Sequence, residues 1–344
     1  MSDPRPRQTD GGSDAARLLH AAARRRSVAM ADLFLPDRLR LSEQQRAVVR
    51  GLLDKTVRAV EDELRAGLSS PFQDNPGLHA ALSSAHVEIA GPLLASSPAL
   101  QEPELLAMLL RRAEEHRLFV SGGGAATLLL DLVGDENGTI AGAAMAVLVA
   151  QSRRFDRFQE PALARTELPA DLQHKLVWTV AAALRLYMIR HHQVSPAAAD
   201  AALCTAVGAL LAGYDEGDTL EARALRLAKA AEAADRLDSG FLTRSLLDGS
   251  LSLFIASLSI PSGLQPAAIA ELLLGDGDGA VLLLRACSFE REQAAAILLR
   301  LGPGAEARLD RFDVTSEAEA RDALLLWRTD ACYRAAIVRV GEGA

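Results

Sequence analysis

Apolar side chains recur every three or four positions along most of this chain, which is the spacing of one face of an α-helix. The clearest stripe follows Ser42 and predicts a helix with one narrow hydrophobic seam, made of Val49, Leu53, Val57, Val60 and Leu64. No segment shows a convincing alternation of apolar and polar residues, which would predict a β-strand. The pattern therefore predicts an all-α protein.

Two short sequence elements occur twice. Ile89-Ala90-Gly91 followed by Gln101-Glu102-Pro103 recurs as Ile140-Ala141-Gly142 followed by Gln159-Glu160-Pro161. Each proline suits the first turn of a helix, where its missing N–H is harmless, so we expect helices to begin at Pro103 and Pro161. Repeated helical units of this kind predict a HEAT-like α-helical solenoid, in which each unit buries its apolar face on its neighbour.

The pattern divides the chain into four parts. Residues 1–13 lack an apolar stripe and are expected to form a disordered tail. Residues 14–68 predict an N-terminal helical hairpin, residues 78–169 the HEAT-like repeats, and residues 170–340 a C-terminal all-helical region. In that last part, Ser316 with Glu319 forms a capping-box pattern, which predicts a final helix that runs past Trp327 and Tyr333.

The N-terminal hairpin needs a further surface, because two helices cannot bury both of their apolar faces on each other alone. The seam from Val49 to Leu64 could pack against a second copy of the hairpin, which would give a homodimer with a four-helix bundle. It could equally pack inside the chain, onto the first repeat. The sequence leaves both arrangements open.

Charge and composition narrow the function classes. The formal net charge of −8 and the aromatic content of 4% oppose a nucleic-acid surface, for which weak, salt-sensitive binding through Arg24-Arg25-Arg26 is the only plausible form. The longest apolar stretch, Ile140 to Ala150, is too short to cross a bilayer, and no apolar segment of a secretory signal follows the charged N-terminal residues. The three separated cysteines fit buried thiols in a reducing compartment. We therefore expect a cytoplasmic protein that does not bind membranes.

Candidate chemistry is sparse. His191 and His192 are adjacent, so their side chains diverge on a helix and cannot hold one metal ion together. The glycine run at 122–124 lacks the lysine and hydroxyl of a phosphate-binding loop. The stretch from Gly275 to Gly279 resembles the start of a calcium loop, but Cys287 stands where its closing glutamate is needed. We expect no catalytic residue, cofactor or metal.

Two histidines carry an alternative hypothesis of phosphorelay signalling. His20 lies in the N-terminal hairpin, and a bundle of such hairpins is the architecture in which histidine kinases carry their phosphoacceptor. However, His20 is followed by Arg24-Arg25-Arg26 and lacks an acidic neighbour. His116 has acidic neighbours in Glu114 and Glu115, although a helix-terminal residue bonded to an adjacent repeat explains it as well.

Several segments together resemble a known family. They are Ala31-Asp32-Leu33-Phe34-Leu35, Leu41-Ser42-Glu43, the helix ending at Arg65, His116-Arg117, and Leu242 to Gly249 with Leu251 and Phe254. This set is similar to the bacterial domain-of-unknown-function 2336 family over about residues 25–300. The resemblance implies an all-helical, HEAT-like protein of uncharacterised function, and it supplies no catalytic residues.

The sequence thus favours a non-enzymatic cytoplasmic scaffold or regulatory protein that binds a protein partner through its helical repeats. The alternative is a phosphorelay protein that uses a histidine of a helical bundle. Nucleic-acid binding ranks third.

Overall fold

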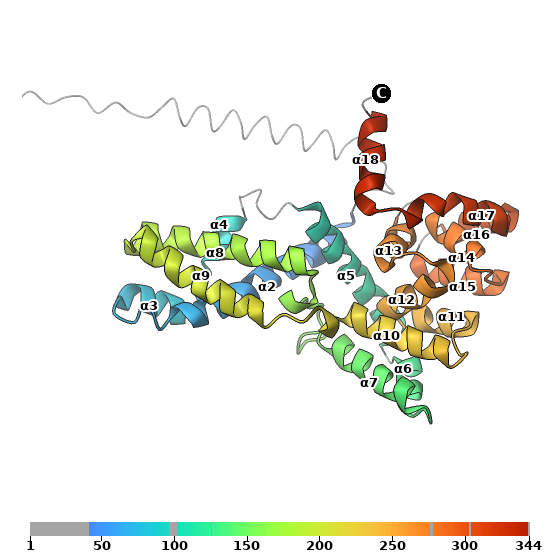
Figure 1. The fold of residues 1–344 in the computed structure, drawn as a ribbon, viewed down its shortest axis with the longest axis horizontal. Coiled ribbons are helices and arrows are strands. Elements are labelled where there is room, and N and C mark those ends of the chain that lie inside the picture. Colours follow the sequence, from blue (N-terminus) through green and yellow to red (C-terminus); the bar gives the residue numbers. More distant parts are fainter. Residues whose placement is uncertain (1–40, 96–101, 125, 276–277, 303, 343–344) are drawn as a thin grey trace, which may run out of the picture. The chain divides into compact units, whose positions relative to one another are not determined.

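The computed structural model describes residues 41–95, 102–124, 126–275, 278–302 and 304–342. Within these ranges every regular element is a helix, apart from one isolated antiparallel bridge between Phe155 and Pro161. The chain is therefore all-α, as its hydrophobic pattern predicts. Residues 45–344 form one compact unit, which Figure 1 shows in sequence colours.

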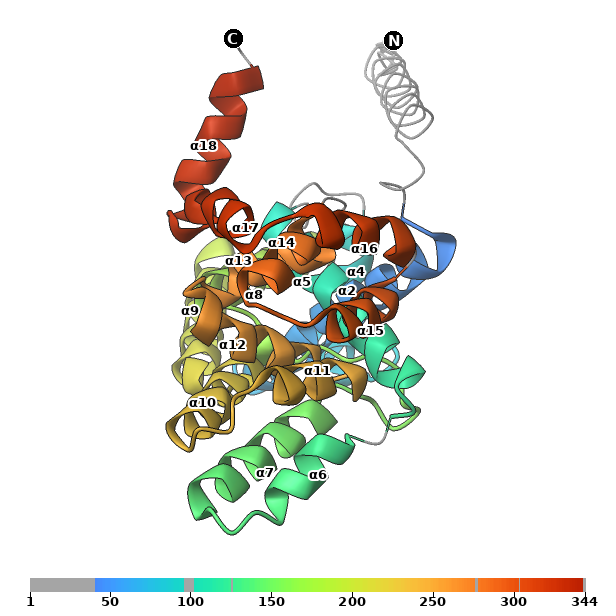
Figure 2. The ribbon, with the colours of Figure 1, turned by 90° about the vertical axis from the view of Figure 1, so that its right-hand side faces the viewer.

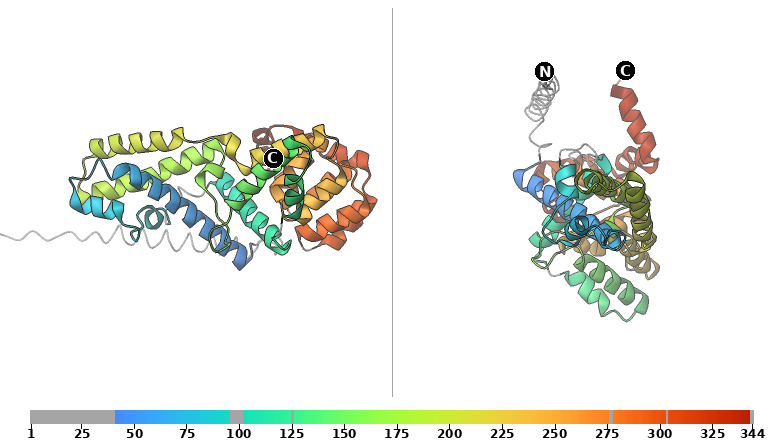
Figure 3. Two further views of the ribbon diagram at one scale, coloured as in Figure 1. Left: turned by 90° about the horizontal axis from the view of Figure 1, so that it is seen from below. Right: turned by 90° about the vertical axis from the view of Figure 1, so that its left-hand side faces the viewer.

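The first hydrophobic core gathers helices from two separate parts of the sequence. Its members are α2 (Glu43–Leu68), α3 (Pro76–Ser83), α4 (Ala90–Leu94), the first half of α5 (Pro103–Ser121), α8 (Ala170–His192) and α9 (Pro196–Ala212). Helices α8 and α9 lie side by side, as Figure 3 shows. The C-terminal end of α2 approaches α9 so closely that a Cβ added at Gly67 would lie 3.2 Å from Cβ of Ala206.

A second core is built around α7. It joins α6 (Thr127–Val133), α7 (Gly138–Ser152) and α10 (Leu220–Ala233), with contributions from α11 (Ser239–Leu247) and α12 (Leu251–Ser262). Helix α7 packs against both α6 and α10, and α10 packs in turn against α12. Figure 2 shows α6 and α7 as a hairpin beside α10.

The third core holds the C-terminal helices. Besides Leu118 of α5 and residues of α11 and α12, it contains side chains from α13 (Pro266–Leu274), α14 (Gly279–Ala286), α15 (Arg291–Leu301) and α16 (Ala305–Val314). The chain then continues as α17 (Glu317–Ala323), the 3₁₀ turn η5 (Leu325–Arg328) and α18 (Ala331–Glu342). Helix α5 thus contributes to the first core through Leu105 and Leu109 and to the third through Leu118.

Side-chain caps fix where many of these helices begin. The side chains of Asn75, Asn137, Ser195 and Thr219 each accept a backbone N–H in the first turn of α3, α7, α9 and α10. A cap of this kind satisfies one of the backbone donors that a helix start leaves unpaired. Helix α5 begins at Pro103, as the sequence predicts, and helix α9 begins at Pro196, directly after Ser195.

One glycine lets α5 pack closely on the turn between α11 and α12. Gly249 has a φ of +82°, which side chains other than glycine rarely adopt. A Cβ at this position would also lie 2.5 Å from Cα of Phe119. A glycine is therefore required at position 249 for two reasons, which are its backbone conformation and its close contact with Phe119.

Two sequence predictions of helix boundaries are wrong. No helix begins at Pro161, which instead lies in the bridge with Phe155, so the second Gln-Glu-Pro element is not the structural equivalent of the first. The capping box of Ser316 and Glu319 is present, but the helix that it starts ends at Ala323. Residues Leu325–Arg328 form a 3₁₀ turn and α18 is a separate helix, so no single helix runs past Trp327.

Among the described residues, no single helix is long and apolar enough to cross a membrane. One pair, α12 and α13, reaches that length and composition together, with a bend of 112° between the two helices.

Candidate functional site

Arg65 of α2 is buried and holds the loop between α3 and α4. Its Nε donates to the carbonyl of Leu82 at 2.9 Å, and its two terminal nitrogens donate to Glu61 and to the carbonyls of Val87, Ala81 and Ser84. A guanidinium has five N–H donors. All five are used here, four of them on backbone carbonyls.

Glu61, one helical turn before Arg65, fixes the start of α4. Its carboxylate accepts the backbone N–H of Ile89 at 3.0 Å and that of Ala90 at 2.8 Å. A carboxylate is favourable at this end of a helix because it pairs with unsatisfied N–H groups. The first Ile-Ala-Gly element is therefore a helix start held by Glu61, whereas the second, Ile140 to Gly142, lies inside α7.

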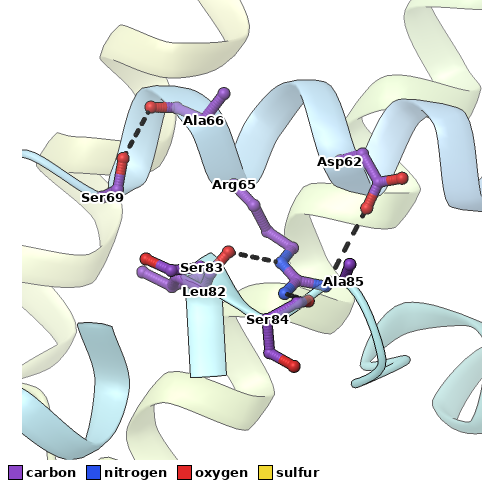
Figure 4. Close-up of a pocket in the computed structure, with 8 residues that line it drawn as sticks. All are labelled: Asp62, Arg65, Ala66, Ser69, Leu82, Ser83, Ser84 and Ala85. Atoms are coloured by element: carbon purple, nitrogen blue, oxygen red, sulfur yellow. Dashed lines mark hydrogen bonds and ion pairs between the residues drawn. The ribbon is translucent and has the colours of Figure 1, made fainter. Parts of the chain in front are cut away.

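A pocket of about 270 Å³ lies beside this pair (Figure 4). Its lining residues are Asp62, Arg65, Ala66, Ser69, Leu82, Ser83, Ser84 and Ala85. Arg65 is the only basic side chain among them, and its donors already serve the loop carbonyls. An anionic ligand would have to break these hydrogen bonds to reach Arg65. We therefore interpret the pocket as space left beside the loop that Arg65 holds, rather than as a ligand site.

A second group of buried charges centres on Arg154, in the turn after α7. Arg154 is only 3% exposed and donates to carboxylates from three other elements. The distances are 2.8 Å to Glu115 of α5, 2.7 Å to Glu167 of the 3₁₀ turn η3 (Arg165–Glu167) and 2.6 Å to Glu221 of α10. One guanidinium thus joins segments that are far apart in the sequence.

The carboxylates of this Arg154 cluster have further partners. Glu115 also pairs with Arg112 and accepts the hydroxyl of Ser252 on α12 at 2.8 Å. Glu167 accepts the backbone N–H of Leu220, at the start of α10, at 3.1 Å. Arg111 lies 3.6 Å from Glu221. The cluster therefore balances Arg111, Arg112 and Arg154 against Glu115, Glu167 and Glu221.

The balance of charges determines which groups stay ionised. Burial alone would raise the pKa of Glu221, but the attraction of Arg154 and Arg111 lowers it to about 2. Burial also opposes the charge on Glu115, yet Arg112 and Arg154 lower its pKa below the ordinary value. Desolvation would lower the pKa of Arg154, but Glu221, Glu115 and Glu167 raise it overall. All these groups are therefore charged near pH 7.

Arg112 is the weakly held member of the cluster. Burial, followed by repulsion from Arg154, lowers its pKa to about 9. Its Nε and Nη1 are buried without a protein partner. Arg112 thus gains less from the cluster than Arg154 does.

This arrangement is a structural cross-link. A general acid or base needs a pKa near the working pH and a reachable proton, whereas the carboxylates of Glu115 and Glu221 are held ionised by guanidinium groups. Within the described ranges, no group of three His, Cys, Asp or Glu side chains is placed to hold a metal ion. The cluster therefore fixes α5, α10 and α12 relative to one another.

Of the two candidate phosphoacceptors, His20 lies outside the described residues. His116 lies on α5, next to Glu115, with its ring centroid 5.7 Å from that of Phe155. Its Nδ1 is buried without a partner. Burial lowers its pKa from the ordinary value more strongly than Glu160 raises it, so the ring is neutral near pH 7.

The predicted dimer seam on α2 lies in the first core of the chain itself. Val57, Val60 and Leu64 are almost completely buried, Val49 is buried as well, and Leu53 packs partly buried against the same core. These side chains are buried within one chain, but the core that buries them contains α8 and α9 as well as helices of the first repeat, onto which the sequence analysis placed the intramolecular packing. A second copy could reach them only if the core opened.

Sequence reasoning missed the Arg154 cluster. The one local signal that could have indicated it is the presence of the charged residues Arg111, Arg112 and Glu115 within an apolar helical pattern. The partners Glu167 and Glu221 come from distant segments, so no local spacing reveals them.

The fold and these clusters describe an all-helical protein whose buried charges are structural. A family model described as "Uncharacterised protein conserved in bacteria (DUF2336)" matches residues 123–328, which is more than half of the chain. The chain belongs to this family, which confirms the resemblance found in the sequence. The searches of curated proteins and of solved structures found no match.

Proposed function

We propose that this chain is a non-enzymatic cytoplasmic scaffold or regulatory protein that binds a protein partner through HEAT-like stacked helices. The observation that supports this most is the outward face of α7. A face that is apolar, free of charge and exposed is typical of protein contact surfaces.

Helix α7 has no charged residue over its 15 positions. Its inner side is buried against α6 and α10 through Ile140, Ala144 and Val147. On the outer side, Met145 is 45% exposed and Val149, one turn further on, is 42% exposed. A helix that is apolar all round is normally buried on all sides. The outer face of α7 therefore has the composition of a surface that another molecule covers.

The packing of neighbouring helices supports the HEAT-like part of the proposal. Helices that follow each other in sequence pack as pairs, namely α6 with α7, α8 with α9, α11 with α12 and α15 with α16. Helix α10 then connects one pair to the next, because it packs against both α7 and α12. Stacking of helix pairs leaves extended outer faces for binding.

The test is capture of partners by the full chain, with chemical cross-linking, from a lysate of the bacterium that encodes it. The double variant Met145→Glu/Val149→Glu should lose at least about tenfold of any specifically recovered protein, because two charges would be buried in the contact. The matched control is Leu299→Glu on α15, where the leucine is exposed. Equal recovery by wild type and the α7 variant, with both folded by circular dichroism, would reject this surface.

The phosphorelay alternative rests on His20 and His116, and the geometry at His116 does not favour it. Phosphoryl transfer needs an accessible ring nitrogen, and Nδ1 of His116 is buried beside Phe155, so only Nε2 is left as the accepting atom. An acid-labile, base-stable phosphate that disappears in His20→Ala or His116→Ala would establish the alternative and replace the scaffold proposal.

A further inference from the structure

The outer face of α7 changes in character along the helix. Met145 lies near the middle of α7 and is half-exposed, and Val149 follows one turn later on the same side. Towards the N-terminus the same side carries small residues, the exposed Gly138 and Gly142 and the half-buried Ala141. Figures 1 and 2 show α7 at an edge of the helical unit, where a second molecule can approach it.

An exposed cation lies at the C-terminal end of this face. Arg153 directly follows α7 with helical backbone angles and is four positions after Val149, so it continues the same side. Among the described residues it forms no ion pair. Asp218 is near Arg153, but a 2.8 Å hydrogen bond from Arg223 is the larger cause of its lowered pKa. Arg157, in the next turn, is a second exposed cation.

An exposed carboxylate lies at the opposite end of α7. Glu136 directly precedes the capping residue Asn137. Its neighbour Asp135 pairs with Arg236, whereas Glu136 forms no ion pair within the described ranges. Met145 is nine positions after Glu136 and eight before Arg153. The two opposite charges therefore lie at nearly equal distances from the apolar centre, about 12–14 Å along the helix.

We propose that the outer face of α7 binds a second copy of this chain, with the two α7 helices antiparallel about a twofold axis at Met145. Such an axis brings Arg153 of each copy to the end of α7 where Glu136 of the other lies. It also places Val149 opposite the small Ala141, because both are four positions from Met145. The inference rests on the proposed function, since it assigns a partner to the same face.

The order of the charges favours a second copy over other occupants. A uniformly acidic segment would match Arg153 but repel Glu136, and a uniformly basic segment would do the reverse. A matching partner carries both signs at the two ends of an apolar, small-residue stripe, which is the pattern of α7 itself. A contact between two four-turn helices is at the lower end of specific interface sizes, so we expect a weak dimer with a dissociation constant on the order of 10 μM.

The first test is the molar mass of the purified full chain by light scattering, from about 1 to 300 μM at low salt. The wild type should shift from monomer to dimer within this range. The double variant Met145→Glu/Val149→Glu should stay monomeric, which is a weakening of at least about thirtyfold. Leu299→Glu on α15 places the same charge at a residue that is 74% exposed and should dimerise like the wild type.

Exchanging the charges tests the antiparallel arrangement itself. Arg153→Glu and Glu136→Arg should each weaken the dimer by about three- to tenfold, because each places like charges opposite one another. An equimolar mixture of these two variants should dimerise like the wild type, since each copy then meets the opposite charge at both ends. The control Arg190→Glu changes an exposed cation of α8 in the same way and should have no effect.

Three results would overturn the inference. They are a wild-type monomer at every concentration, a dimer that Met145→Glu/Val149→Glu leaves unchanged, and a mixture of the charge variants that dimerises no better than either one alone. A monomeric wild type whose capture of another protein is lost in the α7 variant would overturn this inference and leave the proposed function standing. A dimer abolished by the α7 variant supports the inference even where no other protein is captured.

Discussion

Helices α2 and α18 carry apolar stripes with the same kind of spacing but bury them differently. Val57, Val60 and Leu64 of α2 lie in the first core, whereas Tyr333, Ile337 and Val340 of α18 are exposed. The difference arises from the elements that surround each helix. Distant helices α8 and α9 share the core of α2, while α18 follows the last core and contacts mainly η5. Spacing thus predicts an apolar face but not the surface that covers it.

The same two helices also differ in their charges. Helix α2 buries Glu61 and Arg65, and the hydrogen-bonding groups of both side chains bind the backbone of the loop before α4 and the start of α4. On α18, Arg334 is 13% exposed and pairs with a carboxylate that lies at the surface, that of Glu271 on α13. Removing one partner of a buried ion pair is costly, because the other charge then stays buried and unpaired. Exposed ion pairs contribute little to stability. The following predictions test these contrasts, in order of decreasing effect.

The largest effect is expected for Val60→Asp in α2. An aspartate at this fully buried position has no partner, so the free energy of unfolding should fall by about 5 kcal/mol. Ile337→Asp in α18 should change the stability of the monomer by less than about 1 kcal/mol, because the side chain is exposed. Urea unfolding of both variants at low protein concentration measures the difference. Equal destabilisation would mean that α18 packs within the chain.

Next in size is the loss of Arg154. Arg154→Met should lower the free energy of unfolding by about 3–5 kcal/mol, because it leaves Glu115, Glu167 and Glu221 buried without their shared cation. Arg291→Met removes an exposed pair with Asp313 and should cost less than about 1 kcal/mol. Chemical denaturation compares the two variants. If Arg154→Met cost no more than the control, the cluster would not be a structural cross-link.

A variant of Arg112 tests whether Arg154 is the main cation of the cluster. Its Nε and Nη1 lack protein partners, and burial lowers its pKa to about 9. Arg112→Met should therefore cost clearly less than Arg154→Met in the same unfolding experiment. A larger cost would show that Arg112 rather than Arg154 holds Glu115.

The sequence predicts some of these features and misses others for physical reasons. Spacing and caps predict local structure, so the all-α class, the start of α5 at Pro103 and the capping box at Ser316 are confirmed. The prediction of a helix start at the second Gln-Glu-Pro element is wrong because proline suits the first turn of a helix and a non-helical turn equally well. Pro161 lies in such a turn, bridged to Phe155. The Arg154 cluster depends on pairing between distant segments, which spacing cannot reveal.

A moderate effect is expected from acid. The pKa of Glu221 falls from an ordinary value of 4.5 to about 2 in the folded chain, so the unfolded chain takes up a proton first as the pH decreases. The resulting stabilisation is complete above pH 4.5 and is lost between pH 4.5 and 2, at up to about 3 kcal/mol. Urea unfolding across this range should show a shallower pH dependence for Glu221→Gln. Identical pH profiles would exclude Glu221 as the cause.

The smallest effect is expected at Arg334. Arg334→Ala removes a pair with Glu271 and a contact with the Trp327 ring, and should lower stability by about 1 kcal/mol. Thermal unfolding of monomeric samples measures this change. A loss as large as that of Arg154→Met would mean that the base of α18 is an integral part of the third core.

Hydrogen exchange of the wild-type chain at two concentrations, about 1 and 100 μM, tests the central contrast most directly. The account predicts that α2 from Val57 to Leu64 is strongly protected at both concentrations, because its apolar face is buried within one chain. It predicts that α18 exchanges faster than α2 at both concentrations, because none of the described side chains of α18 is buried. Protection of α18 equal to that of α2, or protection of α2 that increases with concentration, would contradict it.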